Sequence, residues 1–385
     1  MRNFLEQITC YPPAEAKLSL RHVILSLFSR SGDFEKSLCT YLGVNQCVLA
    51  NSGRALLYLL LKKLQDQEGK DRDQVLIPGY TCYSVAASIA KAGLEIRVYD
   101  LDPKTFGADI DDIKRKVNPH TLAIVCQHLF GIPTDLGELV PLAREEKCYL
   151  IEDAAQALGG YMGSMPLGRL ADFGFYSFGR GKPLPLGCGG ALIGKDSRIL
   201  SSLSISKLAN SFTALVKVAG GQVFSSPHMY WLPEALPLGL GETVFDPGFP
   251  ALGIPRKIRT LGEKALSLLA VLNSHRKKIA RTYLEVLDKH NCVTSHDGVP
   301  VYTRFPVIAS EVPISKELKR LGVRRMYPRA IIDELEIRPY LTKAETPTPG
   351  AAEIARRLIT LPTHMGITEN LAHEIATKVK KHFGL

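Results

Sequence analysis

The sequence predicts an α/β fold in which a mostly parallel sheet is flanked by helices, followed by a smaller α+β domain at the C-terminus. Between residues 53 and 178, short apolar runs alternate with helical runs, which is typical of such a sheet. A stretch rich in proline and glycine then ends the alternation, and a long helical run follows it. At 385 residues the chain also exceeds the about 250–300 residues at which single cores stop growing, so two domains are expected.

The elements of the sheet follow from the period of the apolar residues. Helical spacing predicts helices over residues 53–64, 83–92, 109–117 and 136–146. The short apolar runs between them predict strands over residues 75–78, 95–99, 122–127, 148–152 and 173–178.

The second half of the chain is less regular. Residues 201–255 predict an irregular excursion, and residues 258–287 predict one long helix. The C-terminal elements are expected to be an extended stretch, a helix, a strand and a closing helix, over residues 299–308, 315–321, 358–361 and 368–383. We therefore expect a large domain over residues 1–255, which includes the excursion, and a small domain over residues 256–385.

The formal net charge of +10 would suit nucleic acid, an anionic membrane surface or a phosphorylated ligand. No run of five or more Lys and Arg residues occurs, and the basic residues are not interleaved with aromatic ones, so we do not expect nucleic-acid binding. The best apolar segment, residues 208–224, falls short of the ~20 residues that span a bilayer. Weak association of this segment with a membrane surface stays open.

The cysteines indicate neither a metal site nor a disulfide framework, because they form no C-x-x-C pair and no regular spacing. The N-terminus lacks the basic start and apolar core of a signal peptide. We therefore expect a cytoplasmic protein with reduced thiols and no metal. The eight cysteines are Cys10, Cys39, Cys47, Cys82, Cys126, Cys148, Cys188 and Cys292.

Polar side chains stand where the predicted strands end, which is where open α/β sheets bind ligands. Asp153 closes one strand, Ser177 lies near the end of another, and Lys182 follows in a glycine-rich loop. Taken alone, Asp153 could be a helix N-cap and Lys182 a solvated loop residue. Together they provide an acid, a hydroxyl that can donate a hydrogen bond to a phosphate, and an amine. Pyridoxal phosphate requires these three groups.

The first predicted helix begins after Ser52 and Gly53, followed by Arg54. The glycine lets backbone N–H groups approach an anion at the positive end of the helix. The alternative is an ordinary helix start with Ser52 as its N-cap.

These residues resemble the DegT/StrS-type sugar-nucleotide aminotransferases, which have the type I fold of pyridoxal-phosphate enzymes. The E-D-A-A-Q-A-x-G signature is intact, and S-F-x-x-x-K followed by G-x-G-G is intact as well. The remaining matches are a serine-glycine turn, a proline-x-x-threonine strand end and a histidine-x-x-glycine segment. The five matching segments are residues 152–159, 177–190, 52–56, 78–81 and 128–131.

The resemblance implies a role for each site residue. Lys182 would carry pyridoxal 5'-phosphate as a covalent imine, Asp153 would pair with the pyridine nitrogen, Gln156 would lie against the ring and Ser177 would bind the phosphate. Family members are homodimers with shared active sites. In the dehydratase branch a histidine replaces the lysine, so Lys182 favours transamination.

Three departures from the family pattern concern the same site. Arg54 stands where threonine is usual, and it would add a charged phosphate contact or point elsewhere. Cys82 stands where a ring-stacking aromatic is common, so Tyr80, Tyr83 or no ring would stack on the cofactor. Residues 253–256 lack the asparagine of the usual G-x-N-x-R element, which reaches the partner subunit's cofactor, and the excursion is a candidate replacement.

The sequence thus predicts a pyridoxal-phosphate-dependent aminotransferase with Lys182 and Asp153 as catalytic residues and Ser52, Gly53, Arg54, Cys82, Gln156 and Ser177 as further cofactor ligands. Its substrates would be glutamate or glutamine as amino donor and a nucleotide-linked keto sugar as acceptor. Arg180 would bind the donor carboxylate or the diphosphate, and Tyr327 and His364 would lie near the sugar. Alternatives are a dehydratase or lyase on the same scaffold and a catalytically silent homologue.

Overall fold

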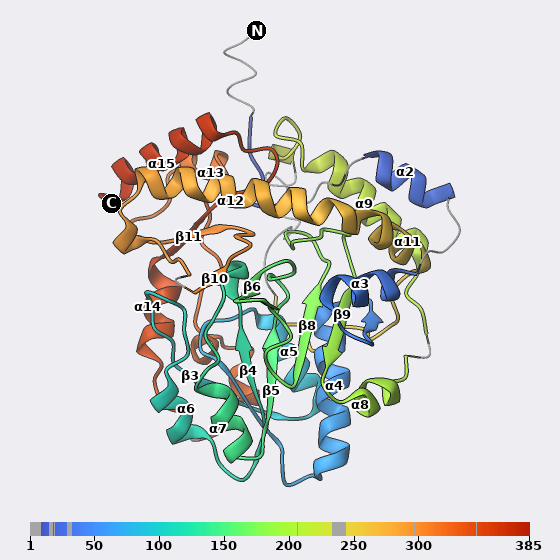
Figure 1. The fold of residues 1–385 in the computed structure, drawn as a ribbon. Helices are drawn as coiled ribbons and strands as arrows, with labels where there is room; N and C mark the ends of the chain where they lie inside the picture. The colour runs from blue at the N-terminus through green and yellow to red at the C-terminus, as the bar shows by residue number, and fades with distance from the viewer. Residues whose placement is uncertain are drawn as a thin grey trace.

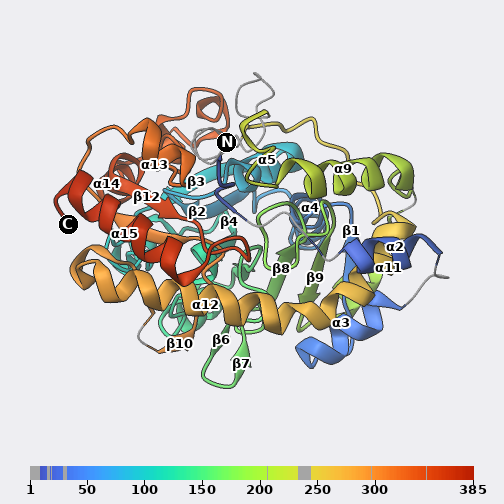
Figure 2. The same ribbon diagram turned by 90° about the horizontal axis from the view of Figure 1, so that it is seen from above.

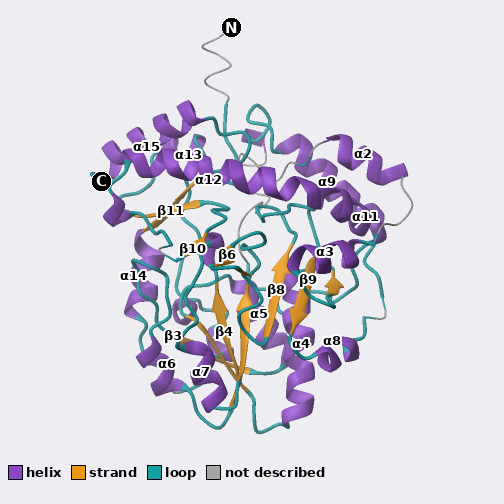
Figure 3. Ribbon diagram, viewed as in Figure 1, coloured by secondary structure: helices purple, strands orange, loops and turns teal. Residues whose placement is uncertain are grey.

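The computed structural model describes residues 9–14, 18, 20–28, 33–205, 207–232, 244–295, 297–343 and 345–385. Its centre is a seven-stranded sheet surrounded by helices (Figures 1 and 3). Five neighbouring strands are parallel, and only β9 runs against its neighbours. In order across the sheet the strands are β1 (Val48–Ala50), β9 (Gly190–Gly194), β8 (Phe173–Ser177), β5 (Tyr149–Asp153), β4 (Thr121–Gln127), β2 (Gln74–Pro78) and β3 (Glu95–Tyr99). The predicted fold class is confirmed.

The strands are apolar along their length because helices cover both faces of the sheet. Every residue of β4 is buried, and so are four of the five residues of β2. Figure 2 shows α4 (Gly53–Glu68) and α5 (Tyr83–Ala92) on one side of the sheet and α12 (Leu269–Val286) on the other. The remaining helices of this half are α2 (Leu20–Phe28), α3 (Phe34–Leu42), α6 (Ile110–Lys116), α7 (Leu139–Glu145) and α8 (Ser197–Ser202).

The pairing register brings the polar strand ends together. Gln127 at the end of β4 lies opposite Asp153 at the end of β5, and Asp153 in turn lies opposite Phe175 of β8. The residues that follow these strands therefore meet at one edge of the sheet, as the alternation of the sequence predicts.

The excursion is more regular than predicted. Within it, α9 (Ser211–Phe224) begins at Asn210, whose side chain accepts hydrogen bonds from the N–H groups of Phe212 and Thr213. The prediction of irregular structure is therefore wrong over Ser211–Phe224. Helical periodicity could not reveal α9, because its apolar residues do not keep to one side.

The predicted long helix is interrupted once. It consists of α11 (Arg256–Ala265), a single 3-10 turn η2 (Leu266–Leu268) and α12. The apolar residues on both sides of the turn keep the helical spacing, so the pattern does not reveal the change of winding.

Two small sheets and three further helices complete the described part of the chain. β10 (Gly298–Val299) pairs with β6 (Tyr161–Met162), which pairs with β7 (Met165–Pro166), and β11 (Phe305–Ile308) pairs with β12 (Leu358–Leu361). The helices are α13 (Lys316–Arg320), α14 (Pro349–Arg357), which was not predicted, and α15 (Glu369–Phe383). The remaining 3-10 turns are η1 (Leu129–Gly131), η3 (Lys289–Asn291), η4 (Ile331–Asp333) and η5 (Arg338–Tyr340). The domain boundary after residue 255 stays a prediction.

Within the described ranges, no helix is both long and apolar enough to cross a membrane.

Candidate active site

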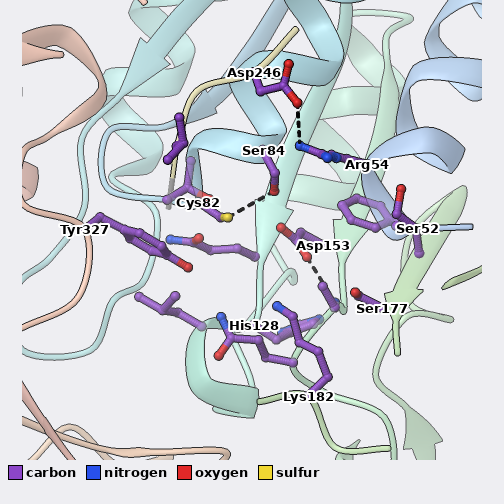
Figure 4. Close-up of a pocket in the computed structure, with 18 residues that line it drawn as sticks. Ser52, Arg54, Cys82, Ser84, His128, Asp153, Ser177, Lys182, Asp246 and Tyr327 are labelled. Atoms are coloured by element: carbon purple, nitrogen blue, oxygen red, sulfur yellow. Dashed lines mark hydrogen bonds and ion pairs between the residues drawn. The ribbon is translucent and has the colours of Figure 1, made fainter. Parts of the chain in front are cut away.

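A cavity of about 460 Å³ lies beyond the carboxyl ends of the parallel strands (Figure 4). It is the place where ligands are expected in an open α/β sheet. All eight predicted cofactor-binding and catalytic residues line it, although they come from four separate segments of the chain. The lining consists of Ser52, Gly53, Arg54, Thr81, Cys82, Ser84, Gln127, His128, Leu129, Asp153, Ala155, Gln156, Phe175, Ser177, Lys182, Val244, Asp246 and Tyr327.

The N-terminus of α4 forms one wall of the cavity. Ser52 is extended and caps the helix by accepting a hydrogen bond from the Ala55 N–H at 3.2 Å. A Cβ atom added to Gly53 would lie 3.2 Å from the Tyr176 carbonyl oxygen, so glycine lets the helix approach β8 closely. The first turn of a helix offers N–H groups that lack intrahelical partners, and these favour an anion at this wall. Ser52 therefore acts as an N-cap and also lines the cavity.

Arg54 is held at the rim of the cavity by residues near the end of the excursion. Its guanidinium lies 3.6 Å from the Asp246 carboxylate and 4.7 Å from the centre of the Phe249 ring. Lys91 Nζ of α5 lies 5.1 Å from the centre of the same Phe249 ring. Figure 4 shows the Arg54–Asp246 pair at the upper edge of the site. The chain around residue 250 is fixed as well, because Asn51 donates a side-chain hydrogen bond to the Pro250 carbonyl at 3.0 Å.

Glu152 and Asp153 are neighbours in β5 but face opposite sides of the sheet, as alternation in a strand requires. The Glu152 carboxylate is fully buried and accepts hydrogen bonds from the N–H groups of Gly168 and Ala171, both at 2.7 Å. His128 lies 2.8 Å from the same carboxylate. Because the Thr134 N–H donates to His128 Nδ1 at 3.1 Å, Nε2 carries the proton and donates to Glu152. Glu152 thus stabilises the fold beneath the site.

The Asp153 carboxylate faces the cavity. It accepts one hydrogen bond, from the Ala155 N–H at 3.0 Å. Burial raises the pKa of Asp153, while the positive charge of Lys182 and the Ala155 hydrogen bond oppose that rise. A cationic ligand atom beside Asp153 would therefore stabilise the ionised carboxylate.

Lys182 enters the cavity from the loop between β8 and β9. Gly181 in this loop has a φ of +74°, which favours glycine, and Gly179 pairs with Gly187 across the loop. These two features turn the chain so that Lys182 points back toward the strand ends. Ser177, at the end of β8, accepts a hydrogen bond from the Gly179 N–H at 3.4 Å. Figure 4 shows Asp153, Ser177 and Lys182 around the same space.

Gln156 and Cys82 line two further parts of the cavity. Gln156 Oε1 accepts a hydrogen bond from the Thr303 hydroxyl at 3.0 Å, which fixes its side chain. Cys82 precedes α5, and the Ser84 hydroxyl donates to its sulfur at 3.0 Å.

The aromatic residues are arranged differently from the sequence alternatives. Tyr80 and Tyr83 are buried outside the cavity lining, and the Tyr83 hydroxyl donates to the Arg329 carbonyl at 3.1 Å. Tyr327 lines the cavity and packs on both rings, with centroids 5.4 Å from Tyr80 and 6.0 Å from Tyr83. The structure thus brings the Tyr327 ring to the cavity, whereas the sequence left Tyr80, Tyr83 or no ring as the alternatives.

Some predicted residues lie elsewhere, and several lining residues were not predicted as site residues. His364 is buried with its ring 2.8 Å from the Pro12 carbonyl, outside this cavity, and Arg180 is exposed and does not line it. Val244 and Asp246 were not predicted. No local pattern distinguishes Asp246 from a surface carboxylate, because its partner Arg54 is far away in the sequence.

Comparisons with known proteins agree with this geometry. The sequence model of the DegT/DnrJ/EryC1/StrS aminotransferase family matches residues 14–217. GDP-perosamine synthase from Caulobacter vibrioides is 26% identical over 341 residues, which are 88% of this chain and 85% of that protein. The dTDP-4-dehydro-2,3,6-trideoxy-D-glucose 4-aminotransferase of Saccharopolyspora spinosa is 25% identical over 363 residues, with 93% and 90% covered.

Solved structures share the fold over nearly the whole chain. PseC of Helicobacter pylori, an aminotransferase involved in the biosynthesis of pseudoaminic acid, has a TM-score of 0.75 at 18% identity, covering 98% of this chain and all of its own. The E. coli GDP-4-keto-6-deoxy-D-mannose-3-dehydratase, with bound hydrated pyridoxal phosphate, has a TM-score of 0.76 at 16% identity and covers 97% and 100%. The chain belongs to the DegT/DnrJ/EryC1/StrS aminotransferase family.

Proposed function

We propose that this protein transfers an amino group from glutamate or glutamine to a nucleotide-linked keto sugar, with pyridoxal 5'-phosphate bound covalently to Lys182. The reaction would serve the synthesis of sugars for cell-surface polysaccharides or secondary metabolites. The observation that carries the proposal is the meeting of Lys182, Asp153, Ser177 and the N-terminus of α4 in one cavity.

The cavity suits pyridoxal phosphate at each of its functional ends. A phosphate fits the N-terminus of α4, where Gly53 packs closely on β8 and where Arg54 and Ser177 provide hydrogen-bond donors. A protonated ring nitrogen fits beside Asp153, whose ionised form needs a cationic neighbour because burial raises its pKa. Bound there, pyridoxal phosphate supplies a carbonyl for covalent capture of amines and an electron sink.

Each residue of the site would then have its own role in the reaction. Asp153 holds a proton on the ring nitrogen, and the charge-assisted hydrogen bond fixes the orientation of the ring. Lys182 Nζ provides the covalent attachment and, once released, moves protons as a general base and acid. Cys82, Gln156 and Tyr327 line the walls between these ends and exclude water from the reacting atoms.

We infer that arginines beside the cavity favour anionic substrates, since Arg304 lies close enough to the cavity-lining Tyr327 to interact with it electrostatically. Arg180, Arg304 and Arg324 all lie close enough to Tyr230 that their charges oppose the burial that raises its pKa. Thr303, next to Arg304, donates to the cavity-lining Gln156. A donor carboxylate and the diphosphate of a nucleotide sugar are both ligands for such a group of cations. This supports an acceptor of the kind named for the perosamine synthase and the trideoxyglucose aminotransferase.

We further propose a homodimer in the cytoplasm, in which part of the excursion (residues 201–255) replaces the missing asparagine contact between subunits. Weak contact between the excursion and a membrane surface is part of the same proposal.

Two measurements test the reaction. The purified protein should show a cofactor absorption band that borohydride removes, and Lys182→Ala should lose it while the exposed Lys104→Ala should not. A set of nucleotide-linked keto sugars, each incubated with glutamate or glutamine, should then yield an aminated sugar by mass spectrometry with one keto acid released per product. A band without aminated product, or deoxygenated product instead, would contradict transamination and favour the dehydratase alternative.

A further inference from the structure

Helix α9 exposes an unbroken apolar stripe on the surface of the molecule. Phe212 is 76% exposed, Val216 54% and Val223 53%, and they follow one another at helical spacing with the exposed Ala219 between them. The opposite side of the helix is apolar too, because Ala214 and Val218 are buried against the core. A helix that is apolar on all sides is normally enclosed. The outer stripe therefore lacks the polar cover that a water-exposed helix has.

The apolar surface continues beyond α9. Leu208 precedes the helix, and Met229 and Trp231 follow it, and all three are exposed. In Figures 1 and 2, α2 lies near α9 on the same upper side of the molecule, and its Ile24 is 45% exposed. We call this surface the α2/α9 face. It consists of Ile24, Leu208, Phe212, Val216, Val223, Met229 and Trp231.

A hollow of about 410 Å³ lies beside the α2/α9 face. It is bounded by Ser225 and Pro227 after α9, by Leu18 before α2, and by Val271 and Leu272 of α12. Most of its lining is apolar, and Val271 at its rim is 59% exposed. The apolar surface is thus continuous with a recess large enough for part of a hydrocarbon chain.

The charges around this face are mainly basic. Arg21 of α2 and Lys207 before α9 are exposed. Helix α11, which packs against both α2 and α9, carries one carboxylate, Glu263, and four basic residues, Arg256, Lys257, Arg259 and Lys264. An apolar helix bordered by basic residues, with Trp231 at its end, is the composition of segments that lie in a membrane interface.

We propose that the α2/α9 face rests on the surface of an anionic lipid bilayer, with its apolar side chains in the headgroup region. With 14 residues, α9 is about 21 Å long, which is too short to cross ~30 Å of hydrocarbon. It would lie in the plane of the interface, held by apolar burial and by attraction of the basic residues to anionic headgroups. The inference rests on the membrane contact in the proposed function and does not depend on the reaction.

Charge favours lipid over a second copy of the chain as the occupant. A two-fold interface brings the same patch of both subunits together. Two α2/α9 faces would then bring two sets of mainly basic residues together, which is unfavourable. An anionic bilayer provides the missing negative charge.

Vesicle flotation of the full-length protein tests the proposal. We expect binding to vesicles of phosphatidylcholine with 30% phosphatidylglycerol and little binding to phosphatidylcholine alone. The triple substitution Phe212→Ser, Val216→Ser and Val223→Ser should lower the partition coefficient at least about tenfold. It removes three apolar side chains that are exposed on the protein and would be partly buried in the bilayer. The matched control Val299→Ser, Val312→Ser and Leu335→Ser changes exposed apolar residues elsewhere and should float like the wild type.

A second variant separates charge from folding. Arg21→Glu with Lys207→Glu keeps the apolar stripe and should weaken binding to the anionic vesicles by about tenfold. Wild-type protein that does not float with anionic vesicles, or a triple variant that floats as well as the wild type, overturns the proposal. The proposal is also overturned if the wild type is a dimer that does not bind vesicles and the triple variant is a monomer, because a second copy of the chain then covers the face. The cofactor band is recorded for every variant, so loss of flotation with an intact band is distinct from failure of the proposed reaction.

Discussion

Arg54 offers the sharpest test of how the cavity would recognise a phosphate. Its guanidinium lies at the N-terminal wall of α4, beside Asp246 and over the ring of Phe249. We predict that Arg54→Ala weakens the binding of pyridoxal phosphate and leaves the binding of pyridoxal, which lacks the phosphate, nearly unchanged.

The magnitude follows from what Arg54 contacts in each state. The pair with Asp246 is 3.6 Å long, and the two side chains are 33% and 49% exposed, so it contributes about 0–1 kcal/mol. The contact with the Phe249 ring contributes about 0.5–1 kcal/mol at such an exposed position. A charge-assisted hydrogen bond to phosphate is worth about 1.5–3 kcal/mol. Arg54 can therefore exchange Asp246 for the phosphate at small cost while it stays on the ring.

These values translate into affinities. Loss of about 1.5–3 kcal/mol raises the dissociation constant of pyridoxal phosphate by roughly 10- to 150-fold. Asp246→Asn removes only a weak competitor for Arg54, so we expect a change of less than about fivefold. Arg54→Lys keeps the charge but loses the planar contact with Phe249, and it should fall between Arg54→Ala and the wild type.

The assay is a titration of cofactor-free protein with pyridoxal phosphate and, separately, with pyridoxal, followed by the absorption band. Arg198→Ala is the matched control, because Arg198 also pairs with an aspartate, Asp196, at 3.1 Å but lies outside the cavity. Equal weakening of both ligands by Arg54→Ala, or no change for pyridoxal phosphate, would refute the assignment of Arg54 to the phosphate.

Three further predictions concern carboxylates. Asp153→Asn should lower the affinity for pyridoxal phosphate roughly 10- to 100-fold, because a charge-assisted bond is lost, yet stabilise the cofactor-free protein. Burial raises the pKa of Asp153, so the stabilisation by Asp153→Asn should be absent at low pH. It should develop as the pH rises from the ordinary pKa of an aspartate to the raised pKa of Asp153, and it should stay constant at higher pH. A variant that is less stable than the wild type in chemical denaturation at pH 8 would speak against this prediction. Glu152→Gln should lower the free energy of unfolding by about 2–3 kcal/mol, because an amide cannot accept from His128, Gly168 and Ala171 together, and an unchanged melting temperature would contradict this. Asp112→Asn should cost about 3 kcal/mol by breaking a buried pair with Lys116 at 2.9 Å, whereas the exposed Asp111→Asn should cost little. Desolvation raises the pKa of Asp112, but hydrogen bonds from Lys116 and the Asp100 N–H outweigh it and hold the pKa below its usual value. The contribution of Asp112 should therefore persist above that usual value and disappear in acid urea titrations as pH falls through the lowered pKa.

The sheet and the convergence of the site residues could be predicted because both depend on local patterns. Apolar runs bounded by polar residues mark strands, and parallel strands bring their carboxyl ends together. Asp153, Ser177 and Lys182 follow strands, so the topology alone places them at one edge. The pleat also separates Glu152 from Asp153, since successive side chains in a strand face opposite sides.

Contacts between distant segments could not be predicted in the same way. Asp246 reaches Arg54 across almost two hundred residues, and neither residue differs locally from an ordinary surface charge. The position of Tyr327 against Tyr80 and Tyr83 likewise depends on how a C-terminal segment packs on the sheet. Such contacts are a property of tertiary packing, which sequence periodicity does not record.

The excursion shows why an apolar pattern can mislead. Periodicity identifies a helix when one side is buried and the other faces water, and α9 does not meet that condition because both of its sides are apolar. Ala214 and Val218 face the core, whereas Phe212 and Val216 face outward. Burial of Ala214 and Val218 explains why the helix forms on this protein. It does not explain why Phe212 and Val216 are apolar, because exposed apolar side chains add nothing to the stability of the fold. Such a surface suits a partner of its own, and the basic residues around it agree with our proposal that this partner is an anionic bilayer.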